Sequence, residues 1–132
     1  MKAFQVSVEN SQLKIECGAT LLDAPIVTEL LAEAKTALRG SDITHVLVIT
    51  NQVTDCTETA KKQLVELQRE FASKVRRSAW VDERSRFRGI ALWVMHLAGD
   101  PRGKAVSTLE QASRWLSSTE VREEQGRKVV GA

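Results

Sequence analysis

The sequence predicts an α/β domain: a mixed, mostly parallel five-stranded sheet that starts with a β-hairpin and is covered by four helices. Three observations support this prediction. Two short segments that alternate apolar and polar residues come first, at positions 4–8 and 12–17. Helical and extended patterns then alternate along the rest of the chain. One extended segment, residues 45–50, shows no polar alternation, which is typical of a strand buried on both faces.

The first two segments predict a hairpin because only a short polar turn, Glu9-Asn10-Ser11, separates them. Gly18 breaks the second strand. Asp23 is placed to cap a first helix, and Pro25 fits the first turn of that helix, where a missing N–H costs little. Gly40 ends the helix. Its apolar stripe recurs at helical spacing and comprises Ile26, Leu30, Ala34 and Leu38.

A polar loop, residues 51–57, follows the central strand and leads to a second helix. The apolar face of this helix comprises Ala60, Leu64, Leu67, Phe71 and Val75. A short strand at residues 78–81 comes next. Because helices of crossover length join these strands, we expect parallel pairing with right-handed connections.

A third helix is predicted at residues 86–98, with Ser85 as its N-cap and the sequence Gly-Asp-Pro-Arg-Gly at 99–103 as its end. A brief strand at residues 104–106 follows. Ser107 and Glu110 then have the spacing of a capping box for a last helix.

Composition fits one soluble globular domain, because 42% of the 132 residues are hydrophobic and 27% are charged. We expect this domain to span residues 1–118, and the mostly charged segment 119–132 to be a flexible tail. A net charge of +2 makes nucleic acid an unlikely partner. No apolar run is long enough for a transmembrane segment, and the N-terminus lacks a signal peptide, so we expect a cytoplasmic location.

The two cysteines and two histidines do not predict a metal site. Cys17 and Cys56 lie in separate segments without metal-ligand spacing, and a zinc site would need both to converge with His45 and His96. Reduced thiols fit a cytosolic protein, although a disulfide between the two cysteines is an alternative. No nucleophile–base motif and no glycine-rich phosphate loop occurs, so we expect no enzyme and no cofactor.

The order of these elements resembles that of STAS domains, which include the anti-sigma-factor antagonists. A divergent bacterial branch, related to the CRAL-TRIO lipid-binding fold, is similar in three motifs. These are Arg-Ser-Ala-Trp-Val at 77–81, Arg-Gly-Ile-Ala-Leu-Trp at 88–93, and Ser-Thr-Leu-Glu-Gln-Ala-Ser-Arg-Trp-Leu at 107–116. The similarity covers roughly residues 4–117. It implies a non-enzymatic protein-interaction module in bacterial regulation or signalling.

The resemblance also implies a phosphorylatable Ser or Thr at the start of the second helix. A gapless alignment places Thr57 at the family's usual Asp and Thr59 at its phosphorylated residue, while Ala60 replaces a Gly. Thr57 and Thr59 are therefore the candidate phosphorylation sites, with a regulatory protein or a kinase as the implied partner. The candidate partner contacts are Thr54, Asp55, Glu58 and Lys61. The alternative is plain capping, either by Thr57 alone or by a capping box of Asp55 and Glu58.

The third helix is apolar on almost every side. A stripe of Phe87, Ala91, Val94 and Ala98 can cover the sheet. A second set, Ile90, Trp93 and Leu97, then needs another partner. A neighbouring helix, a homodimer interface, a docking protein and the wall of an apolar ligand pocket are the alternatives. A small lipid or apolar-ligand carrier is therefore the alternative function.

Basic residues flank the predicted strand at 78–81. They could hold a phosphate, an acidic partner or an anionic lipid head group. They could equally complement a helix C-terminus and form a solvated face. The cluster comprises Lys74, Arg76, Arg77, Arg84, Arg86 and Arg88.

Overall fold

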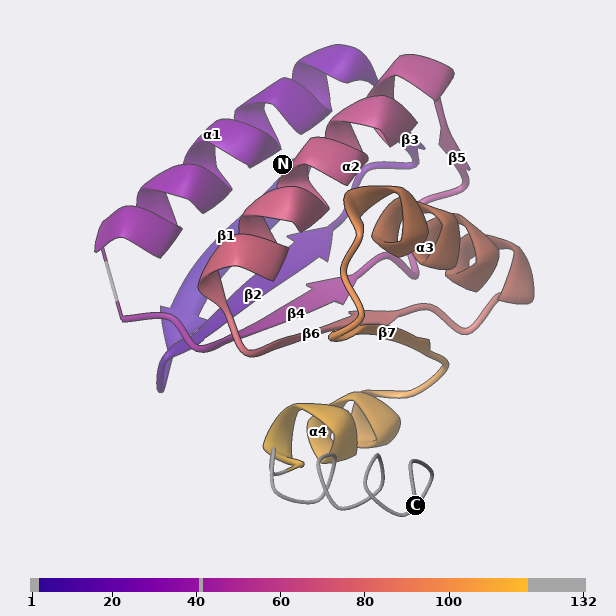
Figure 1. Ribbon diagram of the computed structural model, residues 1–132. Helices are drawn as coiled ribbons and strands as arrows, with labels where there is room; N and C mark the ends of the chain where they lie inside the picture. Colours follow the sequence, from indigo (N-terminus) through magenta and orange to yellow (C-terminus); the bar gives the residue numbers. More distant parts are fainter. Residues whose placement is uncertain (1–2, 41, 119–132) are drawn as a thin grey trace.

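The computed structural model describes residues 3–40 and 42–118 of the chain (Figure 1). Within these residues the strands are β1 (Phe4–Glu9), β2 (Gln12–Cys17), β3 (Leu21–Leu22), β4 (His45–Ile49), β5 (Asp55–Cys56), β6 (Arg77–Val81) and β7 (Gly103–Val106). The helices are α1 (Ala24–Gly40), α2 (Glu58–Lys74), α3 (Ser85–Ala98) and α4 (Leu109–Ser117). The predicted α/β class with a hairpin, a five-stranded sheet and four helices is confirmed.

The main sheet has the strand order β1-β2-β4-β6-β7, so the β-branched strand β4 lies in the centre, as its sequence indicates. The hairpin pair β1–β2 is antiparallel, whereas β2–β4, β4–β6 and β6–β7 are parallel. Asn10 and Ser11 make the hairpin turn with φ values of 51° and 64°. Two consecutive positive φ angles are the signature of a type I′ turn, whose twist matches that of the flanking strands.

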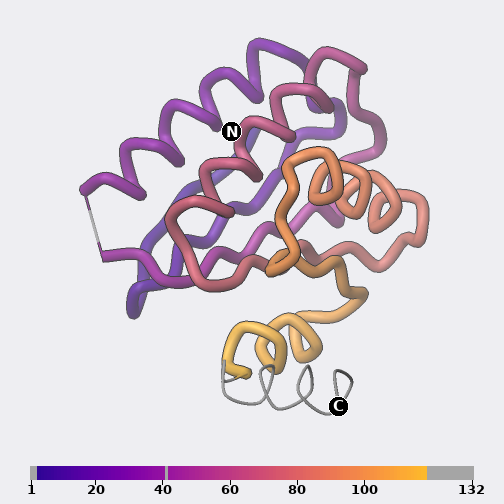
Figure 2. Tube along the Cα trace, in the orientation of Figure 1, coloured from indigo at the N-terminus to yellow at the C-terminus, as the bar shows by residue number. Residues whose placement is uncertain are grey.

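The two faces of the sheet carry unequal helical layers. Of the helices in residues 3–40 and 42–118, α1, α2 and α3 lie on one face and α4 lies on the other (Figures 1 and 2). The first face holds the main core, in which Val27, Leu67 and Phe71 are completely buried. The second face holds a small core, in which Leu116 of α4 packs with residues such as Leu47 and Val106.

A polar network crosses the main core between α2 and β6. The fully buried Gln68 accepts a hydrogen bond from Trp80 Nε1 at 2.8 Å. Its amide nitrogen donates to Ser78 Oγ at 2.8 Å and to Asp100 Oδ2 at 2.9 Å. Because every polar end of the amide has a partner, the network satisfies groups that would otherwise be costly to bury.

Two short strands that the sequence did not reveal join the loops before α1 and α2. Strand β3 pairs in parallel with β5, through Leu21 with Asp55 and Leu22 with Cys56. Two residues are too few to show the alternation by which strands are recognised in a sequence, so this pairing depends on tertiary structure.

The helix caps differ in part from the predicted ones. Asp23 caps α1 as expected, because its Oδ1 accepts a hydrogen bond from Ile26 N at 3.1 Å. The prediction that Ser85 caps α3 is wrong: Arg84 is the N-cap, without a side-chain cap, and Ser85 is the first helical residue. The α4 capping box is shifted by one residue, to Thr108 and Gln111. Ser107 instead donates to Gln111 Oε1, which leaves the cap to Thr108.

The predicted flexible tail at residues 119–132 lies outside the described residues, so the predicted domain boundary stays a prediction. Across residues 3–40 and 42–118, no helix combines the length and the apolar character needed to cross a membrane.

Candidate functional site

The loop between β4 and α2, residues 50–57, is held against the segment that precedes α1. Thr54 N and Asp55 N both donate to the carbonyl of Thr20, at 2.7 and 3.1 Å, and Thr57 N donates to that of Leu22 at 3.0 Å. The Thr54 hydroxyl also donates to the Thr20 carbonyl, at 2.7 Å. We call residues 50–57 the β4–α2 loop. It is fixed mainly by backbone donors; Thr50, Val53 and Cys56 are buried, whereas Gln52, Thr54 and Asp55 are exposed.

The two candidate phosphorylation residues lie in different surroundings at the start of α2. Thr57 is the N-cap, and its Oγ1 accepts a hydrogen bond from Ala60 N at 3.1 Å. The capping-box alternative with Asp55 does not form, because Asp55 Oδ1 instead accepts from Cys56 N at 2.8 Å. Thr59 lies two residues into the helix, is exposed, and has no hydrogen-bond partner among the described residues. One threonine therefore serves the fold, and the other presents a free hydroxyl.

The candidate partner contacts surround these threonines. The exposed Asp55 lies 3.4 Å from Arg86 of α3, and the exposed Glu58 pairs with Lys61 at 3.0 Å. Thr54 is exposed as well, although its hydroxyl is engaged. The structure thus brings Thr54, Asp55, Glu58 and Lys61 together at the N-terminal end of α2. Exposed ion pairs contribute little to stability, so these side chains remain free to change partners.

A buried ionic network lies beside the loop, where β4 and β6 end. The carboxylate of Asp82, which is 2% exposed, accepts hydrogen bonds from Thr50 Oγ1 at 2.8 Å and from Arg84 Nε and Nη2 at 2.9 and 2.8 Å. Arg84 Nη2 also donates to the Thr50 carbonyl at 2.9 Å. The network therefore fixes the first residue of the β4–α2 loop to the turn before α3.

Charge balance in this network follows from opposing effects. Burial on its own raises the pKa of Asp82, but the hydrogen bonds from Arg84 and Thr50 and the charge of Arg84 outweigh it, so the pKa is lowered overall. The same hydrogen bonds raise the pKa of Arg84. Sequence analysis missed this site. Its only signal is the placement of Asp82 and Arg84 directly after a strand that ends beside the loop.

The third helix divides its apolar residues between the core and the surface. Phe87, Ala91 and Val94 are buried against the sheet. Ile90 is partly buried and packs on the main core. Trp93 and Leu97 are exposed by 41% and 46%, and Leu92, which sequence analysis did not select, by 56%. The exposed apolar surface of α3 therefore comprises Leu92, Trp93 and Leu97, with Ile90 at its base.

The cysteines do not offer an active thiol. Both are buried and free. Burial raises the pKa of Cys17 to about 12, with a smaller contribution from Cys56, and burial also raises the pKa of Cys56 to about 11. Such thiols stay protonated at neutral pH and are poor nucleophiles. Over the part of the chain that the structure describes, no group of three or more His, Cys, Asp or Glu side chains is placed to hold a metal ion.

Comparison with known proteins identifies the fold. No protein-family model matches the sequence, and no curated protein is significantly similar to it. Among solved structures, an uncharacterized DUF3478-family protein with a SpoIIAA-like fold from Shewanella loihica PV-4 aligns with a TM-score of 0.64 at 14% identity. That alignment covers 86% of this chain and 92% of the other.

Two structures of SpoIIAA align as well. The Bacillus cell-fate determinant SpoIIAA in its phosphorylated form gives a TM-score of 0.59 at 18% identity, over 84% of this chain and 96% of that one. The anti-sigma-factor antagonist SpoIIAA in its unphosphorylated form gives 0.59 at 16% identity, over 98% of this chain and 100% of that one. The chain therefore has the SpoIIAA-like fold, which confirms the predicted STAS-like architecture.

Proposed function

We propose that this chain is a non-enzymatic regulatory module that binds a partner protein through the β4–α2 loop and the first turn of α2. Phosphorylation of Thr59 switches this binding. The observation that carries the proposal is the exposed, unengaged hydroxyl of Thr59 at the N-terminus of a long helix.

The fold supports a regulatory role. SpoIIAA, whose structure is similar, is described as an anti-sigma-factor antagonist and has been solved both with and without phosphorylation. A fold by itself does not specify a function, so the proposal also depends on the surface at the start of α2. That surface gathers exposed polar and charged residues, among them Thr54, Asp55 and Glu58.

Thr59 is a better modification site than Thr57. A kinase needs a hydroxyl that is accessible and free to react, and the Thr57 oxygen is occupied by Ala60 N. A phosphate on Thr59 would lie within the first turn of α2, where the helix dipole favours negative charge. Modification there leaves the cap intact, so the fold tolerates both states.

The phosphate would change the charge that a partner meets. In the unmodified chain, Asp55 pairs with Arg86 and Glu58 pairs with Lys61, so these four side chains together carry no net charge. A phosphate adds about −1.5 to −2 at neutral pH. A partner that fits the balanced surface would bury this added charge without a counter-charge, so it should lose affinity for the modified surface.

The first experiment tests the modification itself. Native mass spectrometry of the protein purified from its own host should show the mass increment of one phosphate. This increment should disappear in Thr59→Ala and persist in Thr36→Ala, which removes a hydroxyl from the exposed side of α1. An increment retained by the double variant Thr57→Ala, Thr59→Ala would exclude both candidate residues.

The second experiment tests the partner surface. A protein that copurifies with the wild type should be lost from Thr59→Glu, which adds negative charge, and retained by Thr59→Val, which removes the hydroxyl at nearly equal size. Asp55→Lys should also weaken the complex, because it reverses a charge at the centre of the surface. Equal binding by all three variants would place the interface elsewhere.

The exposed apolar surface of α3 favours a second candidate, the binding of an apolar ligand or a second copy. The cavity beneath this helix, bordered by Val53, Trp80 and Ile90, holds only about 10 Å³, which is room for about one water molecule. A lipid would therefore lie on Leu92, Trp93 and Leu97 rather than inside the protein. Trp93→Asp should abolish uptake of a fatty-acid probe or dissociate a dimer, whereas Leu109→Asp, an exposed change on α4, should do neither. An empty lipid extract with a monomeric wild type would reject this candidate.

A further inference from the structure

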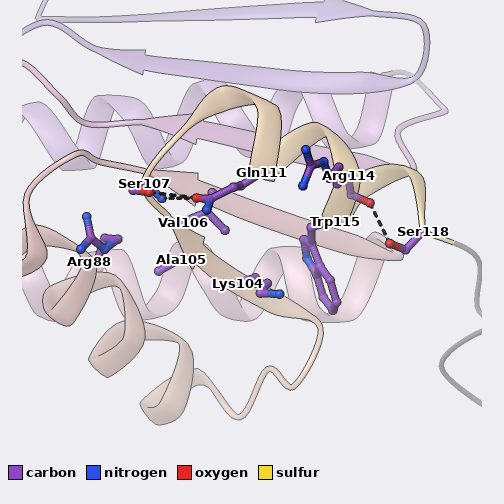
Figure 3. A pocket seen from close by; sticks show the side chains of 9 residues that line it. All are labelled: Arg88, Lys104, Ala105, Val106, Ser107, Gln111, Arg114, Trp115 and Ser118. Carbon is purple, nitrogen blue, oxygen red and sulfur yellow. Dashed lines mark hydrogen bonds between the residues drawn. The ribbon is translucent and has the colours of Figure 1, made fainter. Parts of the chain in front are cut away.

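A pocket of about 470 Å³ lies at the β7 edge of the sheet, between β7, α4 and the first half of α3 (Figure 3). Three basic side chains line it: Arg88 from α3, Lys104 from β7 and Arg114 from α4. The described residues that line it include no carboxylate. Three consecutive elements of the chain, α3, β7 and α4, therefore each contribute one cation to this concave place. We call it the β7 pocket.

We propose that the β7 pocket binds a small phosphate-bearing anion, a phosphomonoester or a polyphosphate. This inference goes beyond the proposed function, because the pocket is lined by residues of α4 and β7 and not by the β4–α2 loop. Its volume falls within the usual range for small-molecule sites. Cations that line a concavity, two of them without an anionic partner among the described residues, concentrate anions there.

Two of the three cations lack an anionic partner among the described residues. Arg88 Nη1 donates to the carbonyls of Asp82 and Glu83, at 2.9 and 2.8 Å, which fixes the guanidinium while its charge stays unneutralised. The Lys104 ammonium lies 5.2 Å from the centre of the Trp115 ring and forms no ion pair with the described residues. Arg114, in contrast, pairs with the exposed Glu110. A guanidinium held by backbone carbonyls is positioned before any ligand arrives, which lowers the cost of binding.

Neutral donors complete the lining. Gln111 Oε1 accepts hydrogen bonds from Ser107 N, Ser107 Oγ and Thr108 N, at 3.0, 2.9 and 3.3 Å. Since the oxygen end of this amide is saturated, its nitrogen end is left as a donor without a partner in the described residues (Figure 3). A phosphate accepts hydrogen bonds on several oxygens and therefore fits a site made of cations and N–H donors.

The wall formed by Trp115 is rigid. Its Nε1 donates to the Ser78 carbonyl at 3.0 Å, and the buried Arg77 stacks on the ring at 4.2 Å. Arg77 Nη1 also donates to the Trp115 carbonyl at 2.9 Å. Lys104 also lies over this ring, with its Nζ 5.2 Å from the ring centre, so it rests on a side chain that is itself fixed.

Ordinary surface chemistry accounts for only part of this arrangement. A lysine on an edge strand discourages pairing with another sheet, and an Arg–Glu pair along a helix is common. These reasons explain Lys104 and Arg114 singly. They do not explain why Arg88 and the free end of Gln111 line the same pocket.

The test uses the full chain, isotope-labelled, with pyrophosphate as the probe at constant ionic strength. The indole N–H signal of Trp115 should shift and saturate. The corresponding signals of Trp80, which is buried in the main core, and Trp93, which is exposed on α3, should not. Phosphate should act in the same way more weakly. Saturation by citrate instead would assign the pocket to carboxylates and overturn the proposal.

Variants of the lining residues, with a matched control, test whether pyrophosphate binds in the β7 pocket. Lys104→Gln should weaken pyrophosphate binding about tenfold, the usual effect of losing one charge-assisted contact. Arg114→Gln should have a smaller effect because Glu110 already neutralises that side chain, and it serves as the second variant should Lys104→Gln not fold. Lys62→Gln, an exposed change on α2, should leave the affinity unchanged. If Lys62→Gln and Lys104→Gln weaken pyrophosphate binding equally, binding depends on the overall charge of the protein and not on the β7 pocket, which would overturn the proposal.

The two proposals can fail separately. The double variant Thr57→Ala, Thr59→Ala should keep its affinity for pyrophosphate, because neither threonine lines the β7 pocket. Conversely, Lys104→Gln should keep its phosphorylation and its protein partner. Loss of pyrophosphate binding in the threonine variant would mean that the anion binds at α2 and that the β7 pocket is not its site.

Discussion

The face of the sheet covered by α1, α2 and α3 contrasts with the face on which α4 lies. Among the described residues, the first face buries a cluster of 25 apolar residues, whereas the second buries a cluster of six. Apolar burial is the main favourable term in folding, so most of the stability should come from the three-helix face. The thinly covered face leaves polar and basic side chains at the surface, which suits it to binding. The predictions below test this difference, from the largest expected effect to the smallest.

Identical leucine truncations on the two faces should differ in cost. Leu67→Ala empties a completely buried site in α2 and should lower the free energy of unfolding by about 3–5 kcal/mol. Leu116→Ala removes the same atoms from α4, where the site is 6% exposed and can collapse, and should cost about 2 kcal/mol. Urea denaturation of both variants measures the difference. Equal losses would show that the small core is as important as the large one.

The polar network within the main core should be nearly as sensitive as its apolar residues. Gln68→Ala leaves Trp80 Nε1, Ser78 and Asp100 without their shared partner, and we expect a loss of about 3 kcal/mol. Ser78→Ala removes one of these bonds and should cost about 1 kcal/mol. Thermal unfolding compares the two. A Gln68→Ala variant as stable as Ser78→Ala would mean that water replaces the amide.

The buried Asp82 should make the stability of the fold depend on pH in the acidic range. Because its folded pKa lies below its usual value of 3.8, the folded state binds fewer protons than the unfolded state. The stability that ionised Asp82 contributes is therefore present above pH 3.8, and it is lost as the pH falls through the folded pKa. Asp82→Asn should cost about 2 kcal/mol at neutral pH and flatten the decline at low pH. Denaturation midpoints between neutral pH and pH 3 test both statements. If Asp82→Asn loses stability at low pH as steeply as the wild type, other carboxylates cause the decline.

Alanine substitutions of the two threonines at the start of α2 should differ clearly in their effect on stability. Thr57→Ala removes the N-cap hydrogen bond and should cost about 1 kcal/mol. Thr59→Ala removes an exposed hydroxyl without a partner in the described residues and should stay within about 0.5 kcal/mol of the wild type. This difference also makes Thr59→Ala a clean test of phosphorylation, because its fold is preserved. A large loss in Thr59→Ala would mean that its hydroxyl has a structural role.

Replacement of His45 should have the smallest effect on stability among these variants. Burial lowers its pKa, and the charges of Arg76 and Arg77 lower it further. The unfolded state therefore takes up a proton before the folded state does, so the stability contributed by neutral His45 is present above the unfolded pKa of about 6.5 and is lost below it. His45→Gln should reduce the slope of stability against pH between 7 and 5. An unaltered slope would exclude His45 as its source.

The sequence predicted those elements well that are long enough to show a regular hydrophobic period. The hairpin, the buried central strand and the apolar faces of α1 and α2 all carry enough residues to show a period of 2 or 3.6. Caps were less predictable. Thr57 and Thr108 cap their helices, but Ser85, which has the right chemistry, becomes the first helical residue because Arg84 and Asp82 bind each other in the preceding turn.

The candidate sites were predictable only in part. The β4–α2 loop could be located because it follows a buried strand and precedes a long helix. The pairing of β3 with β5 could not, since two residues show no pattern. The Asp82 network depends on a contact across 32 positions, between Thr50 and Asp82, and the β7 pocket brings Arg88 of α3 together with residues of β7 and α4. A single sequence does not record which of its polar side chains meet.

The anchoring of the β4–α2 loop to Thr20 and Leu22 has a thermodynamic consequence for any molecule that binds it. A flexible loop must lose conformational entropy when it is gripped, and that loss weakens association. Here the backbone donors of Thr54, Asp55 and Thr57 are already satisfied within the chain. Binding should therefore show a small entropic penalty by calorimetry and an association rate set by diffusion and charge rather than by loop rearrangement.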